Sequence, residues 1–361
     1  MSAVLRSERA DPAASAGRKV RVMIVDDSLT VRTVFTRMLQ KEKDICIVAT
    51  ANTAERGLDE LRTHETDVVM LDLEMPGMGG IEALPKIQQA APGAQVLVIS
   101  SLTADGAEHT VQALSLGAAD TMLKPRPGGF NDSYREALLG KIRALAGVDA
   151  EAPKPAPPAP SPVRSGKRPE VVAIGASTGG IHALNLFLRR IPKNFDLPIL
   201  ITQHLPDSFI PVFARQMEMA ASRPAVLADE GVELKRGHIV IAPGHGHMVV
   251  RKSGGRYVTG LAYHPVKSGC MPSVDPMFES LAMAFDGRVA AVLLSGMGRD
   301  GTEGAQLIAK AGGTLYAQNA ETCAVWGMPR AVTEMGLVAA AGPPEELAAK
   351  VLASAGAEAW A

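Results

Sequence analysis

Short apolar runs alternate with amphipathic segments through the first part of this chain. The segment at 29–42 carries its apolar residues at helical spacing, whereas the runs on either side of it are continuous and short. Such runs predict buried strands, and their alternation with helices predicts a parallel sheet covered on both faces. The predicted strands of this (βα)5, flavodoxin-like unit lie at 20–27, 45–51, 67–73, 95–101 and 119–125.

The second part of the chain shows the same alternation of short apolar runs and amphipathic segments, with one addition. Residues 247–263 predict an antiparallel hairpin with its turn at 253–255, and helices are predicted at 181–191 and 301–312. The remaining pattern predicts a doubly wound, mostly parallel α/β unit. Its predicted strands lie at 171–177, 198–206, 238–244 and 289–298.

A segment rich in proline and alanine separates the two parts. Residues 149–169 keep no apolar period, and such a composition favours extended, semi-rigid chain. A length of 361 residues also suits two domains. The predicted organisation is a loose tail at 1–17, a first domain at 18–146, a linker at 147–168 and a second domain at 169–355.

Bulk properties exclude several classes of protein. The net charge of −1 gives no reason to expect a nucleic-acid partner, and no apolar run approaches the roughly 20 residues of a membrane span. The amino-terminal stretch lacks the apolar segment of a signal peptide. Cys46, Cys270 and Cys323 lie far apart without a C-x-x-C pair, so we expect small buried hydrophobic residues in a reducing cytosol rather than a zinc or redox motif.

Polar side chains collect at the predicted carboxyl ends of the first sheet, where ligand sites of such sheets lie. Crowded carboxylates repel one another unless a cation joins them, and hard oxygen ligands suit Mg²⁺. A lysine and a hydroxyl beside them suit a phosphoryl group. The residues concerned are Asp26, Asp27, Asp72, Ser100, Ser101 and Lys124.

The stretch VVAIGASTGG, at 171–180, allows two interpretations. Gly175 and Gly180 fit a dinucleotide-binding turn, with Ser177 in place of its middle glycine. Gly175, Ser177 and Gly179 fit a G-x-S-x-G turn that exposes a nucleophilic serine. A dinucleotide site also needs an acidic residue at the end of the next strand. That strand ends instead in glutamine and histidine, which favours the nucleophile.

A base and an orienting carboxylate are available for that nucleophile. His204 is predicted at a strand end of the same sheet, and Asp300 follows another strand in a glycine-rich loop. The sequence therefore predicts a Ser177–His204–Asp300 triad at one sheet edge. The predicted oxyanion donors are Met297 and Gly298 on the facing loop and Thr178 at the start of the helix after the serine.

Four other residues receive a structural interpretation. His245 and His247 are expected in a turn rather than at a metal, since no further ligand is spaced for them. Cys270 is not predicted to be a nucleophile because it lies on no evident strand end. Asp275 is predicted to cap or begin a helix.

The first domain resembles the receiver domain of bacterial two-component response regulators, on the basis of IVDDS, VVMLDLEMPGMGG and the Lys-Pro pair after the fifth strand. The resemblance implies that Asp72 accepts phosphate from a histidine kinase and that Ser100 and Lys124 contact the phosphoryl group. It also implies Mg²⁺ bound by Asp27, Asp72 and the Glu74 carbonyl, and by Asp26 through water. The usual aromatic switch position carries Thr121, so the signal must be relayed by other means.

The whole chain resembles the chemotaxis protein-glutamate methylesterase family, through GASTGG, TQHLP, PSVDPMF and SGMGRDG behind a receiver. The resemblance implies a cytoplasmic esterase that removes methyl groups from glutamates of methyl-accepting chemoreceptors and releases methanol. It also implies that the enzyme deamidates receptor glutamines and needs no cofactor for the ester reaction. It implies a chemotaxis histidine kinase as phosphodonor. A catalytically silent, phosphorylation-controlled receptor adaptor is the alternative, while a DNA-binding regulator is disfavoured by the lack of a basic recognition helix.

Overall fold

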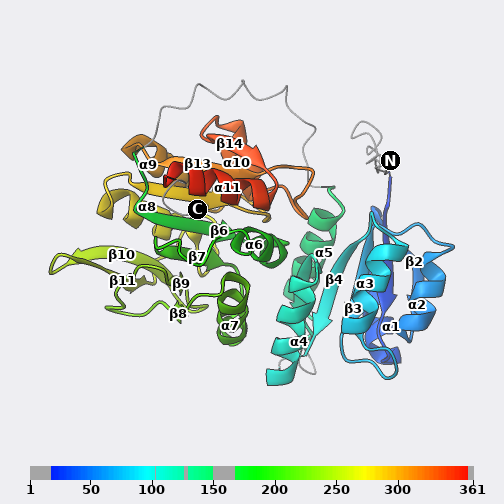
Figure 1. Ribbon diagram of the computed structural model, residues 1–361. Coiled ribbons are helices and arrows are strands. Elements are labelled where there is room, and N and C mark those ends of the chain that lie inside the picture. Colours follow the sequence, from blue (N-terminus) through cyan, green and yellow to red (C-terminus); the bar gives the residue numbers. More distant parts are fainter. Residues whose placement is uncertain (1–17, 102, 126–128, 149–166, 357–361) are drawn as a thin grey trace, which may run out of the picture. The chain divides into compact units, whose positions relative to one another are not determined.

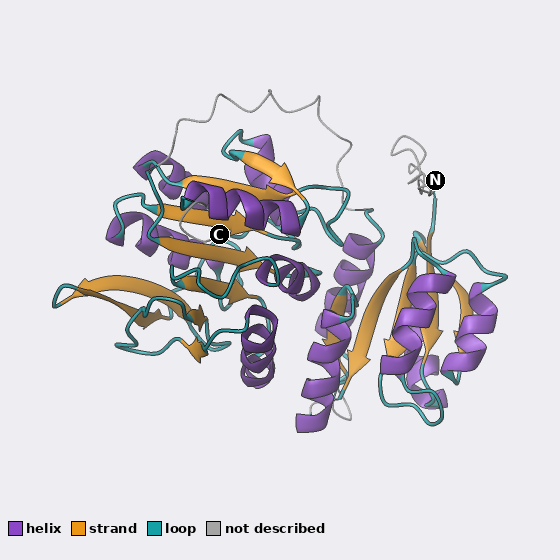
Figure 2. Ribbon diagram, in the orientation of Figure 1, coloured by secondary structure: helices purple, strands orange, loops and turns teal. Residues whose placement is uncertain are grey.

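A computed structural model describes residues 18–101, 103–125, 129–148 and 167–356 of the chain (Figures 1 and 2). The predicted tail at 1–17 and most of the predicted linker lie outside these residues. The chain divides into two compact units, each built on one parallel sheet. Within the described ranges, no helix is long and apolar enough to cross a membrane.

The first unit contains a five-stranded sheet in the order β2-β1-β3-β4-β5, with every neighbouring pair parallel. All five strands were predicted, and the (βα)5 pattern is confirmed. The strands are β1 (Val20–Val25), β2 (Ile45–Ala51), β3 (Val68–Asp72), β4 (Gln95–Ser100) and β5 (Asp120–Leu123). The helices that follow these strands along the chain are α1 (Leu29–Leu39), α2 (Ala54–Leu61), α3 (Gly80–Ala90), α4 (Ala104–Ser115) and α5 (Asp132–Leu145).

The second unit contains a seven-stranded parallel sheet in the order β14-β13-β12-β6-β7-β9-β8, which confirms the predicted mostly parallel α/β class. Four of its strands were predicted: β6 (Val171–Ala176), β7 (Ile199–Gln203), β9 (Ile239–Ile241) and β12 (Val289–Leu293). Three were missed: β8 (Ala225–Leu227), β13 (Thr314–Gln318) and β14 (Ala340–Gly342). The helices are α6 (Gly180–Leu188), η2 (Asp207–Phe209), α7 (Ile210–Ala221), α8 (Val274–Ala284), α9 (Thr302–Ala311), α10 (Met328–Glu334) and α11 (Pro344–Ser354).

The strand order of the second sheet reverses between β6 and β12. From β6 the chain proceeds to β7 and then to the β9–β8 edge, whereas from β12 it proceeds to β13 and β14 on the other side. The loops that leave β6 and β12 therefore diverge at neighbouring strand ends. Such a switch point opens a crevice at the carboxyl edge of a parallel sheet, and ligands bind there in open α/β folds.

The predicted hairpin is present as β10 (His247–Ser253) and β11 (Arg256–Ala262). Ser253 pairs with Arg256, and Gly254 and Gly255 between them have φ of 56° and 82°, the left-handed pair that a tight hairpin turn requires. The hairpin packs on α8, where the rings of Tyr257 and Phe285 stack with centroids 3.9 Å apart. This packing places the start of β10 beside the start of α8, which matters for the site below.

Candidate active site

Ser177 lies in the tight turn between β6 and α6. Its N–H donates to the Ser295 carbonyl at 3.0 Å, and its own carbonyl accepts the Gly180 N–H at 2.8 Å. Gly179 caps the helix with φ of 76°, a left-handed conformation that glycine adopts without strain. Ser177 and Gly179 are partly exposed, while Thr178 and Gly180 of the same turn are buried. The turn therefore presents the hydroxyl at the sheet edge, as the G-x-S-x-G interpretation requires.

The glycines of this turn are required by close packing within the protein. A Cβ on Gly179 would lie 2.6 Å from both the Ala324 Cβ and the Ser295 Oγ. A Cβ on Gly175 would lie 2.6 Å from a Val274 methyl group. Both distances are shorter than side chains tolerate, so the spacing that resembled a phosphate cradle has a structural reason.

His204 follows directly after β7 and joins Ser177 to Asp300. Its Nδ1 lies 3.1 Å from the Ser177 Oγ, and its Nε2 lies 2.7 Å from the Asp300 Oδ2. Because the carboxylate can only accept, Nε2 carries a proton and, in the neutral ring, Nδ1 is the free base that faces the serine. The three predicted side chains thus form one hydrogen-bonded chain at the carboxyl edge of the second sheet.

Asp300 is held at the amino end of α8 and is only 1% exposed. Its Oδ1 accepts the Ser273 hydroxyl at 2.6 Å, and its Oδ2 accepts the Val274 N–H at 2.7 Å. Ser273 is the N-cap of α8, so the helix terminus and its cap both face the carboxylate. These two donors fix the carboxylate that orients His204.

The pKa values of this pair move in opposite directions. Burial by itself would lower the pKa of His204, but the hydrogen bond to Asp300, with a contribution from the nearby Cys270, raises it to about 9. Burial would raise the pKa of Asp300, but His204, Ser273 and the Val274 N–H hold it at about 2. The site therefore stabilises an imidazolium beside a carboxylate, the charge state that develops when a serine gives up its proton.

Sequence reasoning missed the residues behind this carboxylate. The Ser273 N–H donates to the His247 Nδ1 at 3.0 Å, and the His247 Nε2 donates to the His264 carbonyl at 3.0 Å. His247 is buried and opens β10, so it lies at the start of the predicted hairpin and not in the turn that was also expected for it, and its role is structural. The G-H-G-H spacing suggested a loop, and nothing in it pointed to Ser273.

The first unit gathers the predicted carboxylates. Ligand oxygens of Asp26, Asp27 and Asp72 lie within 4.8 Å of one another, with Asp27 exposed and the other two buried. The Lys124 Nζ donates to the Asp72 Oδ2 at 2.5 Å and lies 3.2 Å from the Asp26 Oδ2. Burial, with a smaller contribution from Asp26, raises the pKa of Asp72 to about 6 despite Lys124.

The remaining predicted residues of this unit surround Asp72. The Glu74 N–H donates to the Asp72 Oδ1 at 3.1 Å, which places the Glu74 backbone at the cluster. Ser100 ends β4 and is buried, with its Oγ 3.4 Å from the hydroxyl of Thr121. Ser101, the next residue, donates to the Glu74 carboxylate at 2.5 Å. An all-oxygen cluster with one lysine is a donor set that fits a hard cation and a phosphoryl group.

Two family models match the chain in agreement with these sites. One, described as CheB methylesterase, matches residues 172–351, and the other, described as response regulator receiver domain, matches residues 22–129. A protein-glutamate methylesterase/protein-glutamine glutaminase of Rhodospirillum rubrum is 38% identical over 94% of this chain and 96% of its own length. One from Caulobacter vibrioides is 42% identical over 91% of this chain and 96% of its own length.

The chain belongs to the CheB methylesterase family. The crystal structure of the methylesterase catalytic domain of Thermotoga maritima CheB aligns with a TM-score of 0.50 and 34% identity, and covers 51% of this chain and 98% of that domain. This similarity agrees with the α/β fold of the second unit, and the receiver match agrees with the first.

The loop after β12 brings the predicted oxyanion donors near Ser177. A Cβ on Gly296 would lie 2.9 Å from the Ser177 Cβ, so the loop backbone passes directly against the serine. Met297 is 44% exposed and Gly298 has φ of 82°. Thr178 is buried, and its carbonyl accepts the Ser295 hydroxyl at 2.7 Å. The roles of Thr178, Met297 and Gly298 stay predictions.

The expectation that the cysteines are buried was wrong for two of the three. Only Cys323 is buried, while Cys46 is exposed and Cys270 is half-buried. Cys270 is also not remote from the chemistry, because its Sγ lies within 4.8 Å of ligand atoms of His204 and Asp300. It was missed because a long loop, and not a strand end, carries it there. The expected helical role of Asp275 is confirmed, since this residue lies in the first turn of α8.

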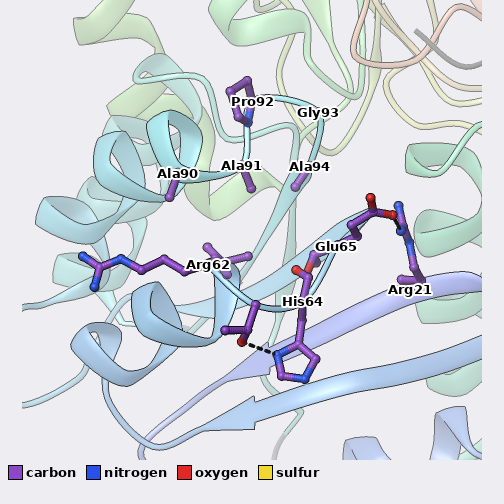
Figure 3. A pocket seen from close by; sticks show the side chains of 12 residues that line it. Arg21, Arg62, His64, Glu65, Ala90, Ala91, Pro92, Gly93 and Ala94 are labelled. Atoms are coloured by element: carbon purple, nitrogen blue, oxygen red, sulfur yellow. Dashed lines mark hydrogen bonds and ion pairs between the residues drawn. The ribbon is translucent and has the colours of Figure 1, made fainter. Parts of the chain in front are cut away.

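A pocket of about 310 Å³ lies elsewhere on the first unit (Figure 3). Loops that precede β3 and β4 line it together with Arg21 of β1, so it lies at the amino ends of strands whose carboxyl ends carry the acidic cluster. Arg21 pairs there with Asp67 and Glu65. The pocket contains none of the predicted site residues.

Proposed function

We propose that this chain is a phosphorylation-regulated serine esterase that hydrolyses glutamyl methyl esters of chemoreceptors and deamidates receptor glutamines. The observation that carries the proposal is the hydrogen-bonded chain from Ser177 through His204 to Asp300. A receptor adaptor without catalysis has no use for a serine held against a base at 3.1 Å whose far nitrogen is bonded to a buried carboxylate.

The geometry supports a two-step acyl transfer. The Ser177 Oγ attacks the γ-carbonyl carbon of the glutamyl ester while the His204 Nδ1 takes the hydroxyl proton. The C–O bond to the methoxy group then breaks, Nδ1 returns the proton, and methanol leaves an acyl-enzyme. Water attacks this ester with Nδ1 as base again, and the released glutamate frees Ser177. With a glutamine side chain, the same steps release ammonia.

Two further features support the transition states of these steps. Asp300 keeps Nε2 protonated and stabilises the imidazolium that forms twice per cycle. The loop after β12, which passes against Ser177, offers the backbone N–H groups of Met297 and Gly298 to the oxyanion, with Thr178 on the facing side.

The first unit is proposed to receive the regulatory phosphate on Asp72 from a chemotaxis histidine kinase. Asp27, Asp72 and the Glu74 carbonyl would hold Mg²⁺, with Asp26 acting through water, and the carboxylate cluster fits this hard cation. When bound, the ion neutralises charge on the phosphoryl oxygens. Lys124, which donates a hydrogen bond to Asp72, and Ser100 would contact the same oxygens.

The remaining expectations follow from this assignment. The substrate would be the cytoplasmic part of methyl-accepting chemoreceptors, so we place the enzyme in the cytoplasm. The proposed domains are 18–146 for the receiver and 169–355 for the methylesterase. Phosphorylation of Asp72 is proposed to raise the esterase rate, by a route that does not use an aromatic switch because Thr121 occupies that position.

Methanol release from a methylated receptor fragment tests the proposal. Ser177→Ala should lose this activity while it keeps the fold, and Ser253→Ala, in the exposed hairpin turn, is the matched control. Undiminished release by Ser177→Ala would exclude the serine as nucleophile. Receptor binding by the wild-type chain without any turnover would instead establish the adaptor.

A further inference from the structure

A second set of chemically reactive groups overlaps the triad. The Sγ of Cys270, a ring nitrogen of His204 and a carboxylate oxygen of Asp300 lie within 4.8 Å of one another. They come from three separate segments: the end of β7, the loop between β11 and α8, and the loop after β12. The triad mechanism uses two of these groups and leaves the thiol unused.

The donor types in this set differ from those of the first unit. Three carboxylates suit a hard cation, whereas one thiolate sulphur, one imidazole nitrogen and one carboxylate oxygen form a mixed set that zinc prefers. Zinc sites with three protein ligands keep a fourth position open to water or a hydroxyl. The partly exposed Ser177 hydroxyl lies 3.1 Å from the His204 Nδ1, so a hydroxyl is available beside the ring that belongs to this set.

The separations allow a cation with little movement. Ligands placed tetrahedrally about 2.0–2.3 Å from zinc lie roughly 3.3–3.8 Å from one another. The ligand atoms lie at most 4.8 Å apart, so the closure needed is at most of the order of 1 Å. Cys270 can supply it, because it is half-buried on an exposed loop, where its thiol contacts the Ser268 carbonyl at 3.8 Å and already interacts with His204.

We propose that Cys270, His204 and Asp300 form an inhibitory site for Zn²⁺ or a similar soft divalent cation at the catalytic centre. Binding exchanges the thiol proton and one imidazolium proton for the metal, so two protons leave as one cation is bound. Through either ring nitrogen, His204 then loses the lone pair that faces Ser177. The serine has no base, and ester hydrolysis stops.

The inhibition rests on the proposed esterase function, but the metal site does not, so the two are measured separately. The full-length chain is titrated with Co²⁺ in excess Mg²⁺, which occupies the carboxylate cluster of the first unit. Thiolate-to-cobalt charge-transfer absorption should appear at one cobalt per chain and should be absent from Cys270→Ser. Cys46→Ser makes the same chemical change at an exposed position of β2 and should keep the band.

Zinc titration of methanol release is the second measurement, with each variant compared with its own metal-free rate. Micromolar zinc should inhibit the wild type and Cys46→Ser, and Cys270→Ser or Cys270→Ala should need about 10- to 100-fold more zinc. A charge-transfer band that persists in Cys270→Ser, or equal zinc inhibition of wild type and Cys270→Ser, would overturn the proposal. A cobalt band in a chain without esterase activity would keep the site and refute the function.

Discussion

Replacing Asp300 with asparagine separates the charge of this side chain from its hydrogen bonds. An asparagine oxygen in the Oδ2 position can still accept from the His204 Nε2 and the Val274 N–H. Its amide group then faces the Ser273 hydroxyl, which can accept instead of donate. The ring therefore keeps its orientation and tautomer, and the main loss is the stabilisation of the imidazolium.

The order of magnitude of that loss follows from the two pKa shifts, to which burial, Cys270, Ser273 and the Val274 N–H also contribute. The pKa of His204 rises from 6.5 to about 9, and the pKa of Asp300 falls from 3.8 to about 2. At about 1.4 kcal/mol per unit, these shifts correspond to roughly 2–4 kcal/mol. Asp300→Asn should thus lower kcat/KM by about 10²-fold on the alkaline plateau, where His204 starts neutral in both proteins.

The pH dependence gives a sharper test than the rate alone. A raised pKa keeps His204 protonated, and unable to act as a base, until the pH passes about 9, so wild-type kcat/KM should rise through that region. Without the carboxylate, the hydrogen bond and charge of Asp300 no longer raise the pKa of His204, while burial still lowers it and Cys270 still raises it. The acid limb of Asp300→Asn should therefore move to lower pH, and the gap between the proteins should narrow toward neutral pH.

The assay is methanol release from a methylated receptor fragment between about pH 5 and about pH 10, with the folded state of both proteins checked across the range. An acid limb that does not move in Asp300→Asn would refute the assignment of that limb to His204. A deficit of equal size at every pH would show that Asp300 acts by position and not by charge.

Three further outcomes are expected. Ser273→Ala removes a hydrogen-bond donor to the buried Asp300, worth about 1.5–3 kcal/mol. The kcat should therefore fall at least about tenfold with KM unchanged, and Ser273→Thr should restore kcat. A fall in KM alone would argue against a role of Ser273 in positioning Asp300. Asp72→Asn should abolish the stimulation of esterase activity by a small phosphodonor with Mg²⁺, and persistent stimulation would exclude Asp72 as acceptor. Gly179→Ala adds a clash at 2.6 Å to the strain of a left-handed backbone, whereas Gly254 has φ of 56° and open space around it. In urea unfolding, Gly179→Ala should therefore lower the free energy of unfolding by about 1–3 kcal/mol more than Gly254→Ala does. Equal losses of unfolding free energy would show that the turn relaxes.

Strand ends were predictable because local pattern determines them. Short apolar runs before Ser177, His204 and Asp72 marked buried strands, and the polar residue after each run marked the edge of a sheet. The strands that were missed carry less signal. β8 and β14 have three residues each, and β13 (TLYAQ) follows α9 with only two glycines between them. Runs of this length do not separate strand from turn.

The support of the site was not predictable for a different reason. Ser273 could be recognised as a helix cap, but its hydroxyl reaches Asp300 only because α8 begins under the loop that follows β12. His247 reaches Ser273 because the hairpin packs on α8. Cys270 arrives on a loop with no periodicity. Contacts of this kind depend on how elements pack, and no spacing along the chain encodes them.

Strand order explains why the triad assembles although its members are 27 and 96 residues apart along the chain. β6 pairs with β12 on one side and with β7 on the other, so the strand that carries Ser177 lies between those that lead to Asp300 and His204. Neighbouring strands are about 4.8 Å apart, close enough for side chains at their ends to meet. A chain with the same strands in another order would place the same three residues at the same edge but out of reach. The catalytic geometry therefore rests on the switch point between β6 and β12, which a single sequence does not reveal.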